Sequence, residues 1–120
     1  FPLSSAHEAV LPRSWISALY SRLHASLAAT SGVEAVNDVI KYVLAGADVV
    51  MTTSALVRRG PSYARSLVDG LDQWLDAQGL TLEQARGLLA VPAEAAGDAY
   101  ARAGYVTALE KARSQYGSLR

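Results

Sequence analysis

Cysteine is absent from the 120 residues, and histidine occurs only at His7 and His24. Without cysteine the chain cannot form disulfides, use a thiolate nucleophile or bind a metal through sulfur. The two histidines stand far apart in the sequence, so their spacing does not indicate a histidine metal site. We therefore predict that the chain has no metal centre.

Net charge is also lacking, because 11 basic side chains balance 11 acidic ones and the isoelectric point is near 6.9. Such a chain has no overall field to attract nucleic acid or an anionic membrane, and we predict neither partner. No apolar run approaches the roughly 18 residues of a membrane span. No signal peptide is recognisable. The composition, 51% hydrophobic, is that of one globular domain at most.

The apolar residues of the first half follow two different spacings. Spacing of three and four residues predicts helices over 13–24 and 35–45, and short apolar runs predict strands over 26–30 and 47–52. Residues 1–13, which contain two prolines, are predicted to form a loop. Helix and strand alternate through short connections, and the strands are apolar on both faces. This order is typical of parallel βα units.

The second half of the chain is predicted to be helical. Pro61 fits the first position of a helix over 61–79, where its missing N–H costs nothing. A hydroxyl-x-x-Gln capping box that starts at Thr81 opens a set of helices over 81–116, the first of which ends near Ala90.

Hydroxyl residues follow both predicted strands. Segments 29–33 and 52–56 each contain the order hydroxyl, hydroxyl, small, apolar. In parallel α/β folds, ligands bind at the carboxyl ends of the strands, where turns and helix N-termini present unpaired N–H groups. The residues that would supply such donors to a phosphate are Ser31, Gly32, Thr53 and Ser54, with the glycine allowing a close approach. The alternative is that these hydroxyls only cap the helices that follow.

The order of these motifs resembles one family of flavoproteins. Residues 29–61, "ATSGVEAVNDVIKYVLAGADVVMTTSALVRRGP", resemble the last two strand–helix units of the dihydroorotate dehydrogenases, which are (β/α)8 barrels. Segment 11–23, "LPRSWISALYSRL", resembles the helix before strand seven, and segment 79–87, "GLTLEQARG", resembles the closing segment. The resemblance implies an α/β fold: a C-terminal fragment of a (β/α)8 TIM barrel, about two βα units plus C-terminal helices. Residues 1–120 would be the C-terminal portion of one FMN-binding barrel domain.

The resemblance also implies a function, the FMN-dependent oxidation of dihydroorotate to orotate in pyrimidine biosynthesis. In the family the backbone of both turns holds the FMN phosphate, and the loop before the upstream helix approaches the flavin. The implied cofactor-binding residues in this sequence are Ser4, Ser31, Gly32, Thr53 and Ser54. The double glycine usual in the first turn is here Ser31-Gly32, and the glycine usual in the second is Thr53. A donor N–H survives each change.

A barrel of this kind needs about 250 residues, and the family takes its general base, lysine and asparagines from earlier strands. We therefore expect the 120-residue chain to be a fragment that starts mid-protein and is inactive in isolation. The implied partners are the remainder of the barrel, a small-molecule substrate such as dihydroorotate, and a second copy in a candidate homodimer, in the cytoplasm. The alanine-rich tail resembles a less characterised dihydroorotate dehydrogenase-like branch, so the substrate stays open.

Two other functions fit the residues alone. The chain could be a phosphate-binding barrel segment of a non-flavin enzyme, or a non-enzymatic helical interaction module. Arg58 and Arg59 follow the second turn, and we predict that they are solvated rather than phosphate ligands. Trp15 and Trp74 lie on apolar helix faces and are predicted to be core residues.

Overall fold

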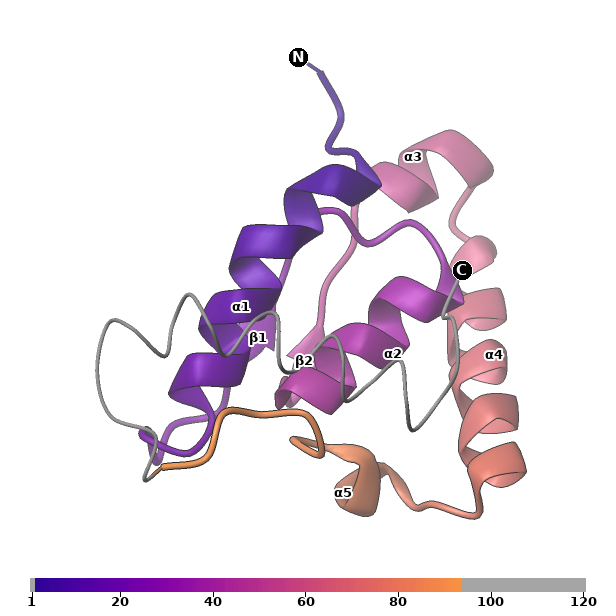
Figure 1. Ribbon diagram of the computed structural model, residues 1–120. Coiled ribbons are helices and arrows are strands. Elements are labelled where there is room, and N and C mark those ends of the chain that lie inside the picture. The colour runs from indigo at the N-terminus through magenta and orange to yellow at the C-terminus, as the bar shows by residue number, and fades with distance from the viewer. Residues whose placement is uncertain (1, 94–120) are drawn as a thin grey trace.

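A computed structural model of the chain describes residues 2–93, in which two short strands lie beside a layer of helices (Figure 1). The elements in chain order are the 3-10 helix η1 (Ala6–Ala9), α1 (Val10–Leu19), β1 (Ala28–Ala29), α2 (Val36–Ala45), β2 (Val49–Val50), α3 (Ser54–Arg59), α4 (Tyr63–Gln78) and α5 (Leu82–Ala85). The predicted C-terminal helical region beyond residue 93 lies outside the described residues.

The two strands form a parallel sheet in which Ala28 faces Val49 and Ala29 faces Val50. Further backbone bonds extend the ladder, including Met51 N to the Ala29 carbonyl at 2.8 Å. Helix α2 connects the strands and contacts both α1 and α4, so it is the central helix of the layer (Figure 1). The predictions of an α/β fold and of parallel pairing are confirmed. Within the described residues the strands are shorter than the predicted 26–30 and 47–52.

Among residues 2–93, helices cover one face of the sheet and leave the other open. Ala29 is 2% exposed and joins a core cluster, against which Val50 also packs. The buried members of this cluster are Ala9, Ile16, Ala29, Val33, Tyr42, Ala45 and Ala47. On the opposite face Val49 and Met51 remain 53% and 47% exposed. Side chains alternate between faces along a strand, so these two share the uncovered face, and the sheet is apolar on both sides as predicted.

Helix α1 begins earlier and ends earlier than the predicted 13–24. The loop prediction for residues 1–13 is wrong from Ala6 onward, because η1 and α1 occupy that segment. Pro12 is the third residue of α1, where a backbone N–H has no partner inside the helix, so the proline does not break it. At the other end the apolar stripe continues to Leu23, but Leu23 is 46% exposed and lacks the burial that would stabilise another regular turn.

Helix α2 agrees with the predicted 35–45 to within one residue, and α4 agrees with the predicted 61–79 to within two. Pro61 precedes α4 instead of opening it, in a turn closed by Tyr63 N on the Gly60 carbonyl. Gly79 ends α4 in the left-handed conformation, with φ of 66°. Helix α3 was not predicted, because its six residues are too few to show a period.

Helix α5 starts with the predicted capping box but ends at Ala85, short of the predicted Ala90. The chain after it turns to cap α2 instead. Gly87 N donates to the Val43 carbonyl at 3.0 Å, and Leu89 N donates to the Leu44 carbonyl at 2.9 Å. The last carbonyls of a helix have no partner inside it. Bonding to these carbonyls of α2 therefore takes the place of the backbone bonds that would have continued α5.

Trp15 and Trp74, both predicted to be core residues, have different environments. Trp15 is 60% exposed, so the prediction is wrong for it. Trp74 is half-buried and packs, with Leu71, against the second core cluster, which consists of Val43, Leu75 and Ala85. Among residues 2–93, none of the helices has the length and apolar character needed to cross a bilayer.

Leu75 is the residue through which α4 contributes most to this second cluster, since it is 8% exposed. We expect Leu75→Ala to lower the free energy of unfolding by about 2–5 kcal/mol, because it leaves a cavity between α4 and α2. Asp72→Ala, on the exposed face of α4, should change it by less than about 0.5 kcal/mol. Urea unfolding of the protein monitored by circular dichroism measures both. Equal midpoints would show that α4 packs through another face.

Candidate functional site

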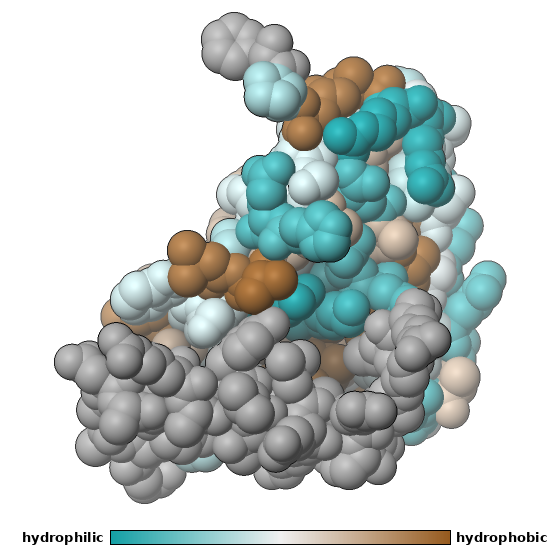
Figure 2. Space-filling view, turned by 45° about the horizontal axis from the view of Figure 1, so that its top comes forward, coloured by the Kyte–Doolittle hydropathy of each residue, from teal (hydrophilic) through white to brown (hydrophobic). Residues whose placement is uncertain are grey.

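The turns that follow β1 and β2 lie side by side, as predicted. Parallel pairing brings the carboxyl ends of both strands to the same edge of the sheet. Thr52 Oγ1 then donates to the Val33 carbonyl at 2.8 Å, which ties the second turn to the first. Figure 2 tilts the top of the view in Figure 1 toward the reader, where hydrophobic and hydrophilic surface lie side by side.

The N-terminal segment reaches the same edge and closes it. Ser4 N donates to Ser54 Oγ at 3.2 Å, and the two hydroxyl oxygens are 2.8 Å apart. Ser54 is 8% exposed, and it is the first residue of α3. Whichever hydroxyl donates in this pair, it uses one of the two hydroxyl hydrogens. The other hydrogen stays available to a ligand at this edge.

The turn after β1 has two consecutive residues with positive φ, 80° at Ser31 and 68° at Gly32. We expected the glycine to let a phosphate approach. In the structure the space beside the Gly32 Cα belongs to the N-terminal segment: a Cβ there would lie 2.6 Å from Ala9 N and 2.9 Å from the Ser5 carbonyl oxygen. The close approach at Gly32 is therefore between two segments of this chain.

Tyr42, a core residue of α2, holds the turn after β1 in place. Its side chain lies in the core at 0% exposure, and its single hydroxyl hydrogen is shared by the Thr30 carbonyl at 2.9 Å and the Ser31 carbonyl at 2.8 Å. Burial raises the pKa of the phenol above its ordinary 10.0, partly opposed by the positive charge of Arg13. The tyrosine therefore stays neutral and keeps donating over the physiological range. The sequence pattern places Tyr42 only on the helix 35–45, and nothing in it marks this role.

Helix capping does not explain the hydroxyl residues of the two turns. Thr53 is the residue that precedes α3, is exposed, and makes no capping bond through its side chain. Helix α2 is preceded by Ala35 rather than by Ser31. True side-chain capping occurs at Thr81, whose hydroxyl accepts from Gln84 N at 3.2 Å. The alternative of simple caps is wrong for the two turns.

Arg58 is exposed to solvent, as predicted, and is also held in place by other residues. Its guanidinium donates twice to the Ser4 carbonyl, at 3.0 Å each, and forms an ion pair with Glu34. Arg59 lies over the ring of Tyr63, 4.7 Å from its centroid. The spacing of two arginines after a turn gives no signal for the partners of Arg58, because Ser4 and Glu34 come from distant segments.

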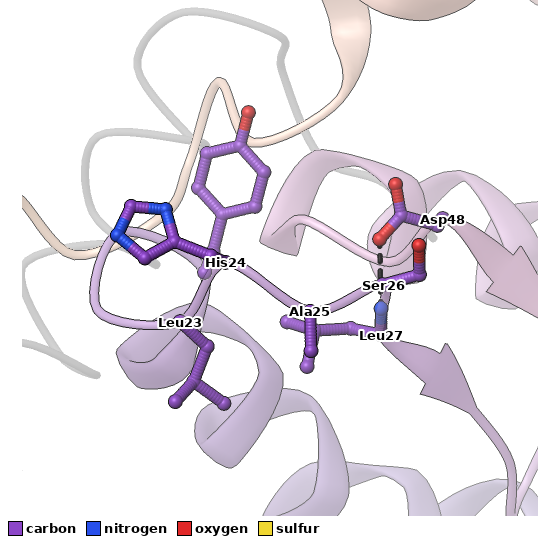
Figure 3. Close-up of a pocket in the computed structure, with 7 residues that line it drawn as sticks. Leu23, His24, Ala25, Ser26, Leu27 and Asp48 are labelled. Carbon is purple, nitrogen blue, oxygen red and sulfur yellow. Dashed lines mark hydrogen bonds between the residues drawn. The ribbon is translucent and has the colours of Figure 1, made fainter.

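A pocket of about 190 Å³ lies at the opposite, amino-terminal edge of the strands (Figure 3). Asp48 accepts from Leu27 N at 2.7 Å, drawn as a dashed line in Figure 3, and forms an ion pair with Arg86 at 3.5 Å. These contacts join the starts of both strands to the segment after α5. Among residues 2–93, no group of three or more His, Asp or Glu is placed to hold a metal ion.

No family model matches the sequence. A protein of Aeropyrum pernix named "Putative dihydroorotate dehydrogenase A (fumarate)" is 34% identical over 61 residues. The matched stretch covers 51% of this chain and 20% of that protein, so the chain spans about a fifth of the length of the relative it matches. This similarity supports a dihydroorotate dehydrogenase-like relationship for part of the chain.

The contrast between Ser31 and Gly32 gives a test of the first turn. Ser31→Gly should leave the free energy of unfolding unchanged or raise it by up to about 1 kcal/mol, because glycine adopts positive φ without strain. Gly32→Ala should lower it by more than about 2 kcal/mol, because strain adds to the clash with Ala9. Thermal unfolding compares them. A Gly32→Ala variant as stable as the parent would show that the N-terminal segment does not pack here.

The hydrogen bonding of the Tyr42 hydroxyl should be measurable as stability. Tyr42→Phe removes the one donor that the Thr30 and Ser31 carbonyls share, so we expect a loss of about 1–3 kcal/mol in the free energy of unfolding. Tyr20→Phe is the matched control, because the Tyr20 hydroxyl makes one long, exposed bond of 3.4 Å to Arg86. Urea titration of both variants decides the point, and equal losses would contradict the role given to Tyr42.

Proposed function

We propose that the chain is the C-terminal part of an FMN-dependent oxidoreductase of the dihydroorotate dehydrogenase type, and that its two turns hold the FMN phosphate. The observation that carries this proposal is the meeting of Ser4 with Ser54 at the carboxyl edge of two parallel strands. Two residues 50 positions apart come together there, at the edge where α/β folds bind ligands. The partial similarity to the Aeropyrum pernix protein supports the same function.

The uncovered face of the sheet supports a barrel. Val49 and Met51 are apolar and exposed, and each strand has one edge without a partner among the described residues. In a closed (β/α)8 barrel this face would point into the barrel interior, and both edges would pair with neighbouring strands. Helices α1, α2 and α4 would then be three successive helices of the outer ring. Residues 1–120 would be the C-terminal portion of one FMN-binding domain.

The residues at the edge fit a phosphate group. The Ser4–Ser54 pair has one hydroxyl hydrogen to donate, and Ser54 is buried enough to be shielded from water. Backbone N–H groups of Ser31 and Thr53 would add further donors, and Gly32, which packs against the N-terminal segment, would hold the first turn in place beside them. When bound, FMN would supply the redox chemistry. The general base would come from the remainder of the barrel, and the substrate would be dihydroorotate or a similar small molecule in a cytoplasmic, candidate homodimeric enzyme.

The test is flavin binding by the complete protein that contains this chain. Ser54→Ala removes a hydroxyl that would bind a charged group, so we expect FMN affinity to fall by about 1–3 kcal/mol, roughly 5- to 150-fold. Ser62→Ala is the matched control, because Ser62 is exposed and makes no capping bond through its side chain. Flavin absorbance after purification and FMN titration of the apo forms measure both.

Three outcomes separate the candidate functions. Loss of FMN affinity in Ser54→Ala alone, together with dihydroorotate-dependent reduction of a dye by the parent, supports the proposal. Binding of inorganic phosphate without flavin would identify a barrel of a non-flavin enzyme. A complete protein that binds neither would overturn the assignment and favour an interaction module.

A further inference from the structure

Arg58 is the side chain that joins the three segments of the candidate site. It lies near the end of α3, which begins at Ser54, and its Nη1 and Nη2 both donate to the Ser4 carbonyl at 3.0 Å. Nη1 also pairs with the carboxylate of Glu34, in the turn that leads from β1 to α2. The N-terminal segment, the first turn and α3 thus meet at one guanidinium.

Glu34 is itself fixed from two other directions. Its N–H donates to Asp38 Oδ2 at 3.1 Å, and its carbonyl accepts from the Tyr63 hydroxyl at 2.9 Å. The first turn of α2 and the first turn of α4 therefore set where its carboxylate lies. Because Glu34 is anchored, it can hold the guanidinium of Arg58 in one orientation.

The orientation of Arg58 determines the orientation of Ser4. With the Ser4 carbonyl turned toward the guanidinium, its N–H faces Ser54 Oγ and the two hydroxyls meet. Three of the five N–H groups of Arg58 are used on Ser4 and Glu34, so these bonds go to neighbouring residues of the site. Its side chain and that of Glu34 are 37% and 30% exposed, and an ion pair so open to solvent contributes little to stability.

We propose that Arg58 and Glu34 are positioning residues that hold Ser4 against Ser54 and thereby set the affinity of the site for the phosphate of its cofactor. This inference rests on the proposed function and adds to it a pair of residues that do not touch the ligand. A positioning role differs from an ordinary structural role, because loss of Arg58 should then weaken binding of the phosphate without weakening binding of the flavin ring.

Comparing FMN with riboflavin tests this, since riboflavin has the same ring system and no phosphate. In the complete protein, Arg58→Gln should lower the affinity for FMN about tenfold and change the affinity for riboflavin by less than twofold. Glu34→Gln should also lower the affinity for FMN, by less than Arg58→Gln does, and change the affinity for riboflavin by less than twofold. Arg58→Lys keeps the charge next to Glu34 but loses the two-pronged bond to Ser4, so its FMN affinity should lie between the parent and Arg58→Gln. Fluorescence titration of the apo forms measures each affinity.

Arg59→Gln is the control for charge. It removes a positive charge from the next residue, whose side chain donates to the Tyr63 hydroxyl instead of to Ser4. Its FMN affinity should stay within twofold of the parent. In a Ser4→Ala background the further loss caused by Arg58→Gln should shrink to less than twofold, because the hydroxyl that it positions is gone.

Two results would overturn the inference while leaving the proposed function in place: parent-like FMN affinity in Arg58→Gln, or an equal loss of FMN and riboflavin. An equal loss would assign Arg58 to the general packing of the edge. A parent protein that binds neither FMN nor riboflavin would overturn both proposals together.

Discussion

Parallel pairing of β1 with β2 is the constraint on which the rest of the described structure depends. In an antiparallel pair the two hydroxyl turns would lie at opposite ends of the sheet. The parallel register, with Ala29 opposite Val50, brings them to one edge, where Thr52 bonds to the Val33 carbonyl. Because a parallel connection must cross back over the sheet, α2 necessarily covers one face. The same pairing therefore builds the core and the candidate site.

The carboxyl edge is held by side chains that reach backbone carbonyls. Tyr42 donates upward from the core to the first turn, and Arg58 donates across to Ser4. Because a peptide unit is planar, holding the Thr30 and Ser31 carbonyls also orients the N–H groups of Ser31 and Gly32. An edge built like this presents donors in fixed directions, which is what recognition of a compact anion requires.

The amino edge is organised differently. There Asp48 ties the two strand starts to Arg86, and the ring of Tyr20 packs against both Gly46 and Gly87, leaving no room for a Cβ at either glycine. The segment after α5 also donates to the end of α2. These contacts hold chain segments together and leave only a small surface pocket. The amino edge thus holds chain segments together, whereas the carboxyl edge combines such contacts with the candidate site.

The sequence by itself determined the order of the strands and of every described helix except η1 and α3, the position of α2, the capping box at Thr81 and the placing of both hydroxyl turns after strands. These features follow from local spacing and local hydrogen bonding, which neighbouring residues decide. Only the tertiary structure decided that Gly32 packs under Ala9, that Trp15 is exposed, that the chain after Ala85 leaves the helix, and that Arg58 binds Ser4. Each of these depends on a partner far away in the sequence, and periodicity carries no information about which distant residue arrives beside it.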